Sequence, residues 1–189
     1  MEVQSPDLIE ILEGEAARQY FEDSDFLQAW VALYLRGPWE TVFQSSNFVL
    51  TWYRLFSRDF TPLIIRSTRN GSMTRLVSLA MSRKSALITG AGAHQAEYHA
   101  WLTEEHLGET FIPTALIALK KKFPRFNICF TYIPPGAPLK WTKDHKFFRK
   151  KRFMRILRQR VVRITPDYFA TKLNAKTIRE KIRRLQRLG

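Results

Sequence analysis

Apolar residues in the first part of the chain recur at helical spacing. Within residues 25–35 four of them are three or four positions apart: Leu27, Trp30, Val31 and Tyr34. This spacing predicts an amphipathic helix, with Ser24 as its N-cap and Gly37 at its end. Trp30 lies on the apolar stripe, so its ring is expected in the core.

A second aromatic-rich stripe follows in "FVLTWYRLF", residues 48–56. The Ser45-Ser46-Asn47 triplet supplies capping side chains for a helix here. The predicted apolar face holds Phe48, Val49, Trp52, Leu55 and Phe56. Trp52 is therefore also expected to be a core residue.

Strand-like runs surround these helices. "LIEIL" at 8–12 predicts a first strand followed by a helical turn at 14–21, and 41–44 predicts a brief extended piece. Two longer runs, "PLIIRST" and "MTRLVSLAMS", are separated by Arg69-Asn70-Gly71, and Asn-Gly between such runs predicts a β-hairpin. "SALITG" at 85–90 would be the next strand of this meander.

The remaining pattern adds a helix and a strand to the sheet. Residues 108–123 place five apolar residues on one stripe: Phe111, Ile112, Ala115, Leu116 and Leu119. "FNICFTYI" at 126–133 predicts a central strand in which Cys129 is buried, and 153–165 predicts a strand or strand pair. The class expected is α/β (α+β), a mixed and mostly antiparallel sheet flanked by helices, with a basic C-terminal helix.

Basic residues are concentrated at the end of the chain. The formal net charge is +14, yet residues 140–189 contain 18 Lys and Arg against three acidic residues, a net of +15. Residues 1–139, with 13 basic and 14 acidic residues, have a net charge of −1. A basic nucleic-acid- or anionic-surface-binding module is therefore one function to consider, although no zinc-finger spacing or RNA-binding signature is present.

Composition excludes several other classes. The single cysteine, Cys129, rules out the disulfide framework of a small secreted protein. The acidic N-terminus lacks the pattern of a signal peptide, and no apolar run is long enough to span a membrane. A cytoplasmic location is expected.

Candidate chemistry concentrates in "ALITGAGAHQAEYHAWLTEEH", residues 86–106. Gly90-x-Gly92 follows a strand, but Gln95 occupies the third glycine position of a dinucleotide fingerprint, so a tight turn or close backbone approach is favoured. His94, His99 and His106 lie near Glu97, Glu104 and Glu105 without the spacing of a metal motif. Glu97 or His99 could act as an acid or base beside Tyr98.

"FQSSNFVLTWYRLF" resembles the "F-Q-S-P-x-W-x-x-x-W" signature of the cellulose-biosynthesis-type (CelD/BcsL) acetyltransferases of the GNAT superfamily. Phe43, Gln44, Ser45 and Trp52 match, whereas Ser46 replaces the proline and Phe48 the first tryptophan. "GAGAHQAEYHAWL" resembles the glycine turn of that family and the Asp-Tyr pair that follows it. Glu97-Tyr98 stands where the family has Asp-Tyr. The order of helices and strands agrees over nearly the whole chain.

The resemblance implies that this chain is the N-terminal half of a transferase of polysaccharide biosynthesis with two GNAT-like domains. Residues 1–165 would form the first domain, and 166–189 a basic connecting helix to a second, missing domain. The first domain would bind no cofactor, because no acyl-CoA phosphate loop is found in it, and the second domain or a partner chain would carry the acetyl-CoA or other acyl-CoA. The residues expected to hold a saccharide or other small-molecule acceptor are Phe43, Gln44, Trp52, Tyr98 and His99, with Glu97 as the candidate catalytic base.

Overall fold

The computed structural model describes residues 8–103 and 108–149 of the chain. These residues belong to the first of two units into which the chain divides, and this unit ends at Arg152. The strand pair and the basic helix expected within 150–189 lie outside the described residues.

The described chain contains one early strand, a group of helices, a run of strands, and a mixed segment that ends in two short helices. The strands are β1 (Leu8–Glu13), β2 (Phe60–Arg69), β3 (Ser72–Ser82), β4 (Leu87–Gly90), β5 (Leu102–Thr103) and β6 (Asn127–Cys129). The α-helices are α1 (Glu15–Phe21), α2 (Ser24–Arg36), α3 (Ser46–Leu55), α4 (Gly108–Lys122), α5 (Trp141–Asp144) and α6 (Lys146–Arg149). Two short 3-10 helices are η1 (Val42–Gln44) and η2 (Ala93–Gln95).

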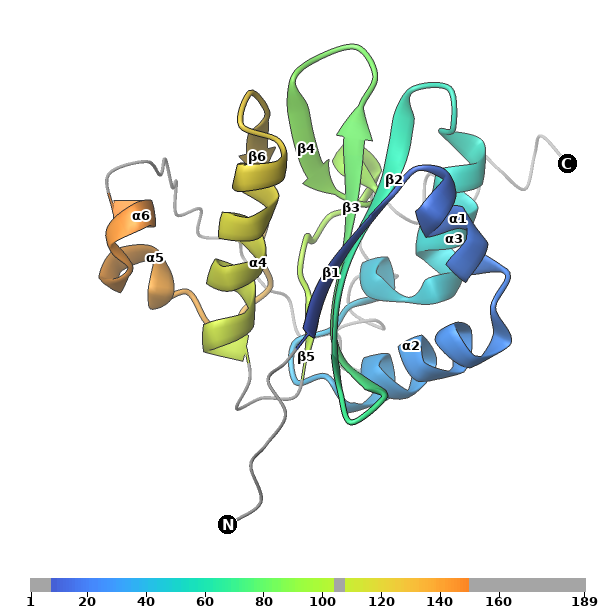
Figure 1. Cartoon of the computed structure of the whole chain (residues 1–189), viewed down its shortest axis with the longest axis horizontal. Coiled ribbons are helices and arrows are strands. Elements are labelled where there is room, and N and C mark those ends of the chain that lie inside the picture. Colours follow the sequence, from blue (N-terminus) through green and yellow to red (C-terminus); the bar gives the residue numbers. More distant parts are fainter. Residues whose placement is uncertain (1–7, 104–107, 150–189) are drawn as a thin grey trace, which may run out of the picture. The chain divides into compact units, whose positions relative to one another are not determined.

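The strands of the described part form one six-stranded sheet (Figure 1). Its order is β1-β2-β3-β4-β6, and β5 also pairs with β3. Neighbours are antiparallel except β4 and β6, which are parallel and are connected through α4. Parallel neighbours need such a crossover connection. The expected class, a mixed α/β fold with a mostly antiparallel sheet flanked by helices, is confirmed.

The predicted hairpin is β2 and β3. Its register pairs Arg69 with Ser72 across the turn. Asn70 and Gly71 both have positive φ, 51° and 78°. Positive φ at both central residues is the geometry of a type I′ turn, whose twist matches that of the flanking strands.

Each face of the sheet is covered by its own core. The helices α1, α2 and α3 cover one face, where Trp30 and Trp52 are 0% and 3% exposed, as predicted for core residues. Helix α4 covers the other face and buries the whole predicted stripe: Phe111, Ile112, Ala115, Leu116 and Leu119. Alternate residues of β2 serve the two cores, with Ile64 facing α1 to α3 and Leu63 facing α4.

Two local predictions before the hairpin were wrong. The N-cap of α2 is Asp23 rather than Ser24, and its carboxylate accepts from the backbone N–H groups of Asp25 and Phe26. Residues 42–44 form η1 instead of an extended piece, because the side chain of Gln44 turns back onto the start of this helix and closes it.

Three predictions about burial and strand position were also wrong. Leu55 is 71% exposed: the buried residues of α3 are Ser46, Val49, Trp52 and Tyr53, and Leu55, the last residue of the helix, lies outside this set. Strand β6 is short and pairs only with β4 among the described strands, so it is an edge strand and not a central one. Cys129 on this edge is consequently exposed.

Candidate functional site

The structure brings together the two segments that sequence analysis singled out, residues 43–52 and residues 90–99. The side-chain Nε2 of Gln44 donates a hydrogen bond to the carbonyl oxygen of Tyr98, at 2.9 Å. The indole Nε1 of Trp52 donates to Oε1 of Gln95, at 3.1 Å. Both bonds join positions more than forty residues apart in the sequence. The start of α3 and the glycine turn after β4 therefore form one local structure.

Gln44 is a structural link within this site. It is 7% exposed, and its Oε1 accepts from both the backbone N–H and the hydroxyl of Thr41, each at 2.9 Å. Its own carbonyl oxygen accepts from the indole N–H of Trp30 in the core. Because Nε2 is bound to Tyr98, both polar atoms of the amide are hydrogen-bonded within the protein, and the side chain holds the glycine turn against α2 and η1.

Trp52 holds the same turn through its indole N–H group. Its ring packs against Phe56 and Phe60, with ring centroids 5.2 and 5.0 Å away, and only 3% of the residue is exposed. Gln95, which the indole holds, is exposed, and its Nε2 lies 2.7 Å from Nε2 of His94. The polar atoms that reach solvent here belong to Gln95 and His94, whereas Trp52 positions them.

The glycine turn is a place of close backbone approach, as the sequence favoured. Gly92 has a φ of 98°, and a Cβ placed there would lie 2.4 Å from the Cβ of Ala96. A Cβ placed on Gly90 would lie 2.5 Å from Cγ of His99. Such separations are far below van der Waals contact, so both positions exclude side chains.

His99 fills the gap beyond the point where β4 and β6 stop pairing. It is 2% exposed, its backbone N–H donates to the carbonyl of Thr131, and its Nδ1 accepts from the N–H of Thr131, both at 3.1 Å. This acceptor role puts the ring proton on Nε2, which lies 2.9 Å from the carbonyl oxygen of Ala93. Burial lowers the pKa of His99, since it disfavours the charged imidazolium.

Glu97 and Tyr98 are the more accessible members of the site. Glu97 is exposed, while Tyr98 and Phe43 are half-buried. Phe43 packs its ring at a steep angle against Phe48 at the start of α3, with centroids 5.1 Å apart. Of the predicted residues, Glu97 presents a carboxylate to solvent next to the turn that Gln44 and Trp52 hold.

Sequence reasoning missed two partners in this site. The sequence drew attention to Gln95 only because it stands where a dinucleotide fingerprint needs its third glycine. In the structure, Gln95 is the hydrogen-bond partner of Trp52. No sequence pattern indicated that Thr131 belongs to the site, because its contact with His99 depends on the parallel arrangement of β4 and β6. An amide next to a glycine turn could have been recognised as a candidate partner for a buried indole.

The histidine and glutamate group does not form a metal site in the described residues. No cluster of three or more His, Cys, Asp or Glu side chains with metal-binding geometry is present among them. Glu104, Glu105 and His106 lie outside the described residues.

Two open hollows are found in the described residues, each with a volume of about 460 Å³. The first is apolar and lies between α2 and the start of α3, with Leu27, Val31, Leu35 and Leu50 among its lining residues. The second is more polar and lies between the start of α4 and α5; its lining includes Glu109, Lys140, Trp141, Asp144 and His145.

Comparison with protein-family models, with curated proteins and with solved structures found no significant match. Within the described residues, no helix is both long enough and apolar enough to cross a membrane.

Proposed function

We propose that the described domain is the acceptor-side half of a GNAT-type N-acyl- or acetyltransferase and does not itself bind acyl-CoA. The observation that carries the proposal is the hydrogen bond between Gln44 and Tyr98, because it joins the two segments on which the resemblance to CelD/BcsL acetyltransferases rests. The contact between Trp52 and Gln95 supports the same pairing.

The hydrogen bonds of the glycine turn support the absence of a cofactor site in this domain. A phosphate-binding loop offers several backbone N–H groups to its ligand. Here the N–H of Ala91 donates to the carbonyl of Ser78, and those of Gln95 and Ala96 both donate to the carbonyl of Gly92. These three donors are used within the protein and are therefore not open to a pyrophosphate. The acyl-CoA would be supplied by a second GNAT domain, on this or another chain.

Glu97 is the residue that we assign the chemical role. When the nitrogen or oxygen of an amine or hydroxyl acceptor attacks the thioester carbonyl of an acyl-CoA, the new C–N or C–O bond replaces the C–S bond, CoA leaves as its thiol, and the acceptor must lose a proton. The exposed carboxylate of Glu97, beside the half-buried Tyr98 and Phe43, can receive that proton from an acceptor lying on the turn. The aromatic rings would provide the apolar contact for a saccharide.

Two titrations of residues 1–189 test the proposal. Isothermal titration with acetyl-CoA should give no binding heat, and micromolar binding would contradict the cofactor argument. NMR titration with glucosamine, a saccharide amine, should shift the amide signals of residues 43–48 and 94–98. Shifts confined to any other region would contradict the acceptor site. Glu97→Gln serves as the matched variant, since it keeps the shape of the site and should retain binding.

The charge of residues 140–189 supports a second candidate function. A net of +15 in this stretch would attract nucleic acid or an anionic surface. This candidate predicts binding to a mixed RNA pool that weakens steeply with salt. Neutralising Arg179, Arg183, Arg184 and Arg187 together should abolish such binding; if the variant binds as well as the parent, the second candidate fails.

A further inference from the structure

Strand β1, the dark blue arrow in Figure 1, is at one edge of the sheet. Among the described strands it pairs only with β2, from Leu8 opposite Thr68 to Glu13 opposite Leu63. A strand at a sheet edge carries backbone N–H and C=O groups that a further strand can pair with.

The hydrogen bonds at the end of β1 show which of its residues face outward. The N–H of Gly14 donates to the carbonyl oxygen of Pro62, at 2.9 Å, and continues the ladder beyond Glu13. In an antiparallel pair, hydrogen-bonded and non-bonded positions alternate along the strand. Counting back from Gly14, the even-numbered residues bond to β2. The N–H and C=O groups of Ile9, Ile11 and Glu13 therefore point away from β2.

Within Leu8–Glu13, β1 itself carries few of the devices that usually prevent strand pairing. Natural edge strands are protected by proline, lysine, bulges or charges that oppose an incoming strand. The sequence of β1 is LIEILE, with no proline or lysine, and its pairing with β2 is continuous. Leu8 at its start is 60% exposed.

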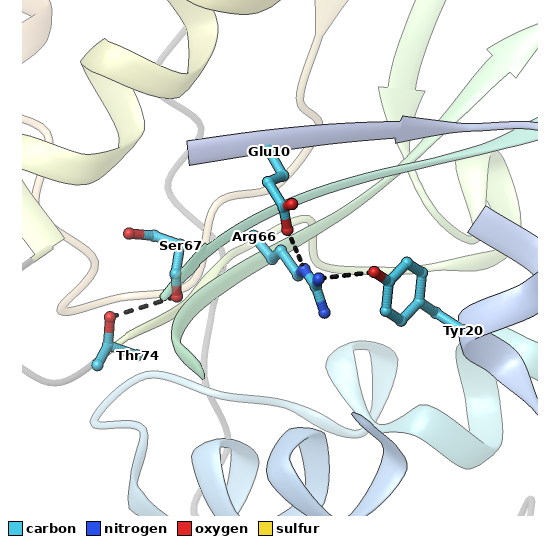
Figure 2. Close-up of polar contacts among 5 residues, drawn as sticks. All are labelled: Glu10, Tyr20, Arg66, Ser67 and Thr74. Carbon is cyan, nitrogen blue, oxygen red and sulfur yellow. Dashed lines mark hydrogen bonds and ion pairs between the residues drawn. The ribbon is translucent and has the colours of Figure 1, made fainter. Parts of the chain in front are cut away.

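Both carboxylates of β1 are neutralised within the domain. Figure 2 shows Glu10 beside the guanidinium of Arg66, whose Nε donates to Oε2 of Glu10 and whose Nη2 donates to the hydroxyl of Tyr20 at 2.8 Å. Glu13 lies 3.6 Å from the ammonium of Lys122 on α4. The two charges on β1 are thus balanced by this chain's own cations and do not repel a second strand strongly.

One antiparallel register of β1 with a second copy places no like charges opposite each other. When Ile11 lies opposite Ile11 of a second copy, Ile9 lies opposite Glu13 and Glu10 opposite Leu12. All the outward backbone groups of Ile9, Ile11 and Glu13 are then paired. A register centred on Glu10 would instead place two carboxylates directly opposite each other, which is unfavourable.

We propose that the outer edge of β1 is the interface of a two-fold symmetric dimer of this chain, with Ile11 on the symmetry axis and the two sheets joined into one. A two-fold axis uses the same surface on both copies, which this register satisfies. The surface is separate from the 43–52 and 90–99 segments, so the dimer leaves the candidate acceptor site unchanged.

A charge-swap experiment at Ile11 tests the interface directly. The parent chain should form a dimer in sedimentation equilibrium over a concentration series. Ile11→Lys and Ile11→Glu each place like charges on the axis and should weaken the dimer by at least about tenfold. An equimolar mixture of the two variants should recover the dimer, because opposite charges then meet on the axis. Circular dichroism melting of each variant shows whether its fold is retained.

A control distinguishes this edge from another exposed apolar surface of the domain. Val31, on α2, is 45% exposed and lines the apolar hollow. Val31→Lys should leave the dimer intact. A parent chain that is monomeric at all concentrations, a dimer lost in Val31→Lys, or a mixture of the Ile11 variants that stays monomeric would each overturn the proposal.

Discussion

Gln44 and Tyr98 are joined by a hydrogen bond from a side-chain amide to a backbone carbonyl, across 54 positions of sequence. We expect Gln44→Leu to destabilise the domain by about 2–4 kcal/mol, because it leaves the carbonyl of Tyr98 and the N–H of Thr41 without this partner. Urea unfolding measures the change. The matched variant Gln95→Leu, at an exposed position, should lower the free energy of unfolding by less. Equal losses would mean that the buried bonds of Gln44 contribute no more to stability than the exposed bond of Gln95.

The stability of the domain should depend on the ionisation of His99. An unfolded histidine has a pKa of about 6.5, and burial lowers the pKa of His99 in the folded state. Its favourable contribution is therefore complete above about pH 6.5 and is lost progressively as the pH falls toward the lower folded pKa. The free energy of unfolding, measured from pH 8 to pH 5, should fall over this window.

Two variants isolate that contribution. His99→Gln, which carries no titrating ring, should remove this part of the acid dependence and lower stability at neutral pH. His94→Gln replaces an exposed histidine and serves as the control for losing one imidazole ring. An unaltered acid dependence in His99→Gln would show that other groups cause it.

Gly90→Ala tests the close approach between the glycine turn and His99. The added methyl would meet the imidazole ring, so we expect a loss of about 1–3 kcal/mol in the free energy of unfolding. The double variant Gly90→Ala with His99→Ala should lose less than the sum of the two single variants, because the smaller side chain removes the clash. Additive losses in this double-mutant cycle would argue against the contact.

Gly71→Ala separates backbone strain from steric clash. Position 71 has open space around it, but its φ is 78°, so the substitution should cost about 1 kcal/mol through the backbone alone. Thermal unfolding should show a small decrease in Tm with an unchanged β-sheet spectrum. A loss as large as that of Gly90→Ala would mean that the turn has contacts beyond its own conformation.

The sequence predicted best those features that neighbouring residues determine. The hairpin follows from Asn70 and Gly71, whose preference for positive φ is local, and the buried stripe of α4 follows from its own periodicity. The cap of α2 was misplaced by one position, because Asp23 and Ser24 are both good caps and only the formed helix distinguishes them.

Features that depend on distant partners were predicted poorly. The apolar run at 126–133 looked like a central strand, but pairing with β4 involves only residues 127–129. The burial of Cys129 was inferred from that run and failed with it. In the candidate site, the sequence identified both segments and predicted the burial of Trp52, but not the burial of Gln44 or the hydrogen bonds by which the two side chains support the turn.

The parallel pairing of β4 with β6 has a consequence for the order of folding. Strands β2 and β3 pair across a two-residue turn, whereas β4 and β6 can pair only when the long connection that contains α4 is closed. Closing a long loop costs more chain entropy and slows contact formation. In pulsed hydrogen exchange during refolding, the amides of the hairpin should be protected first. The amide of Thr131, which is bound to the ring of His99, should be protected among the last.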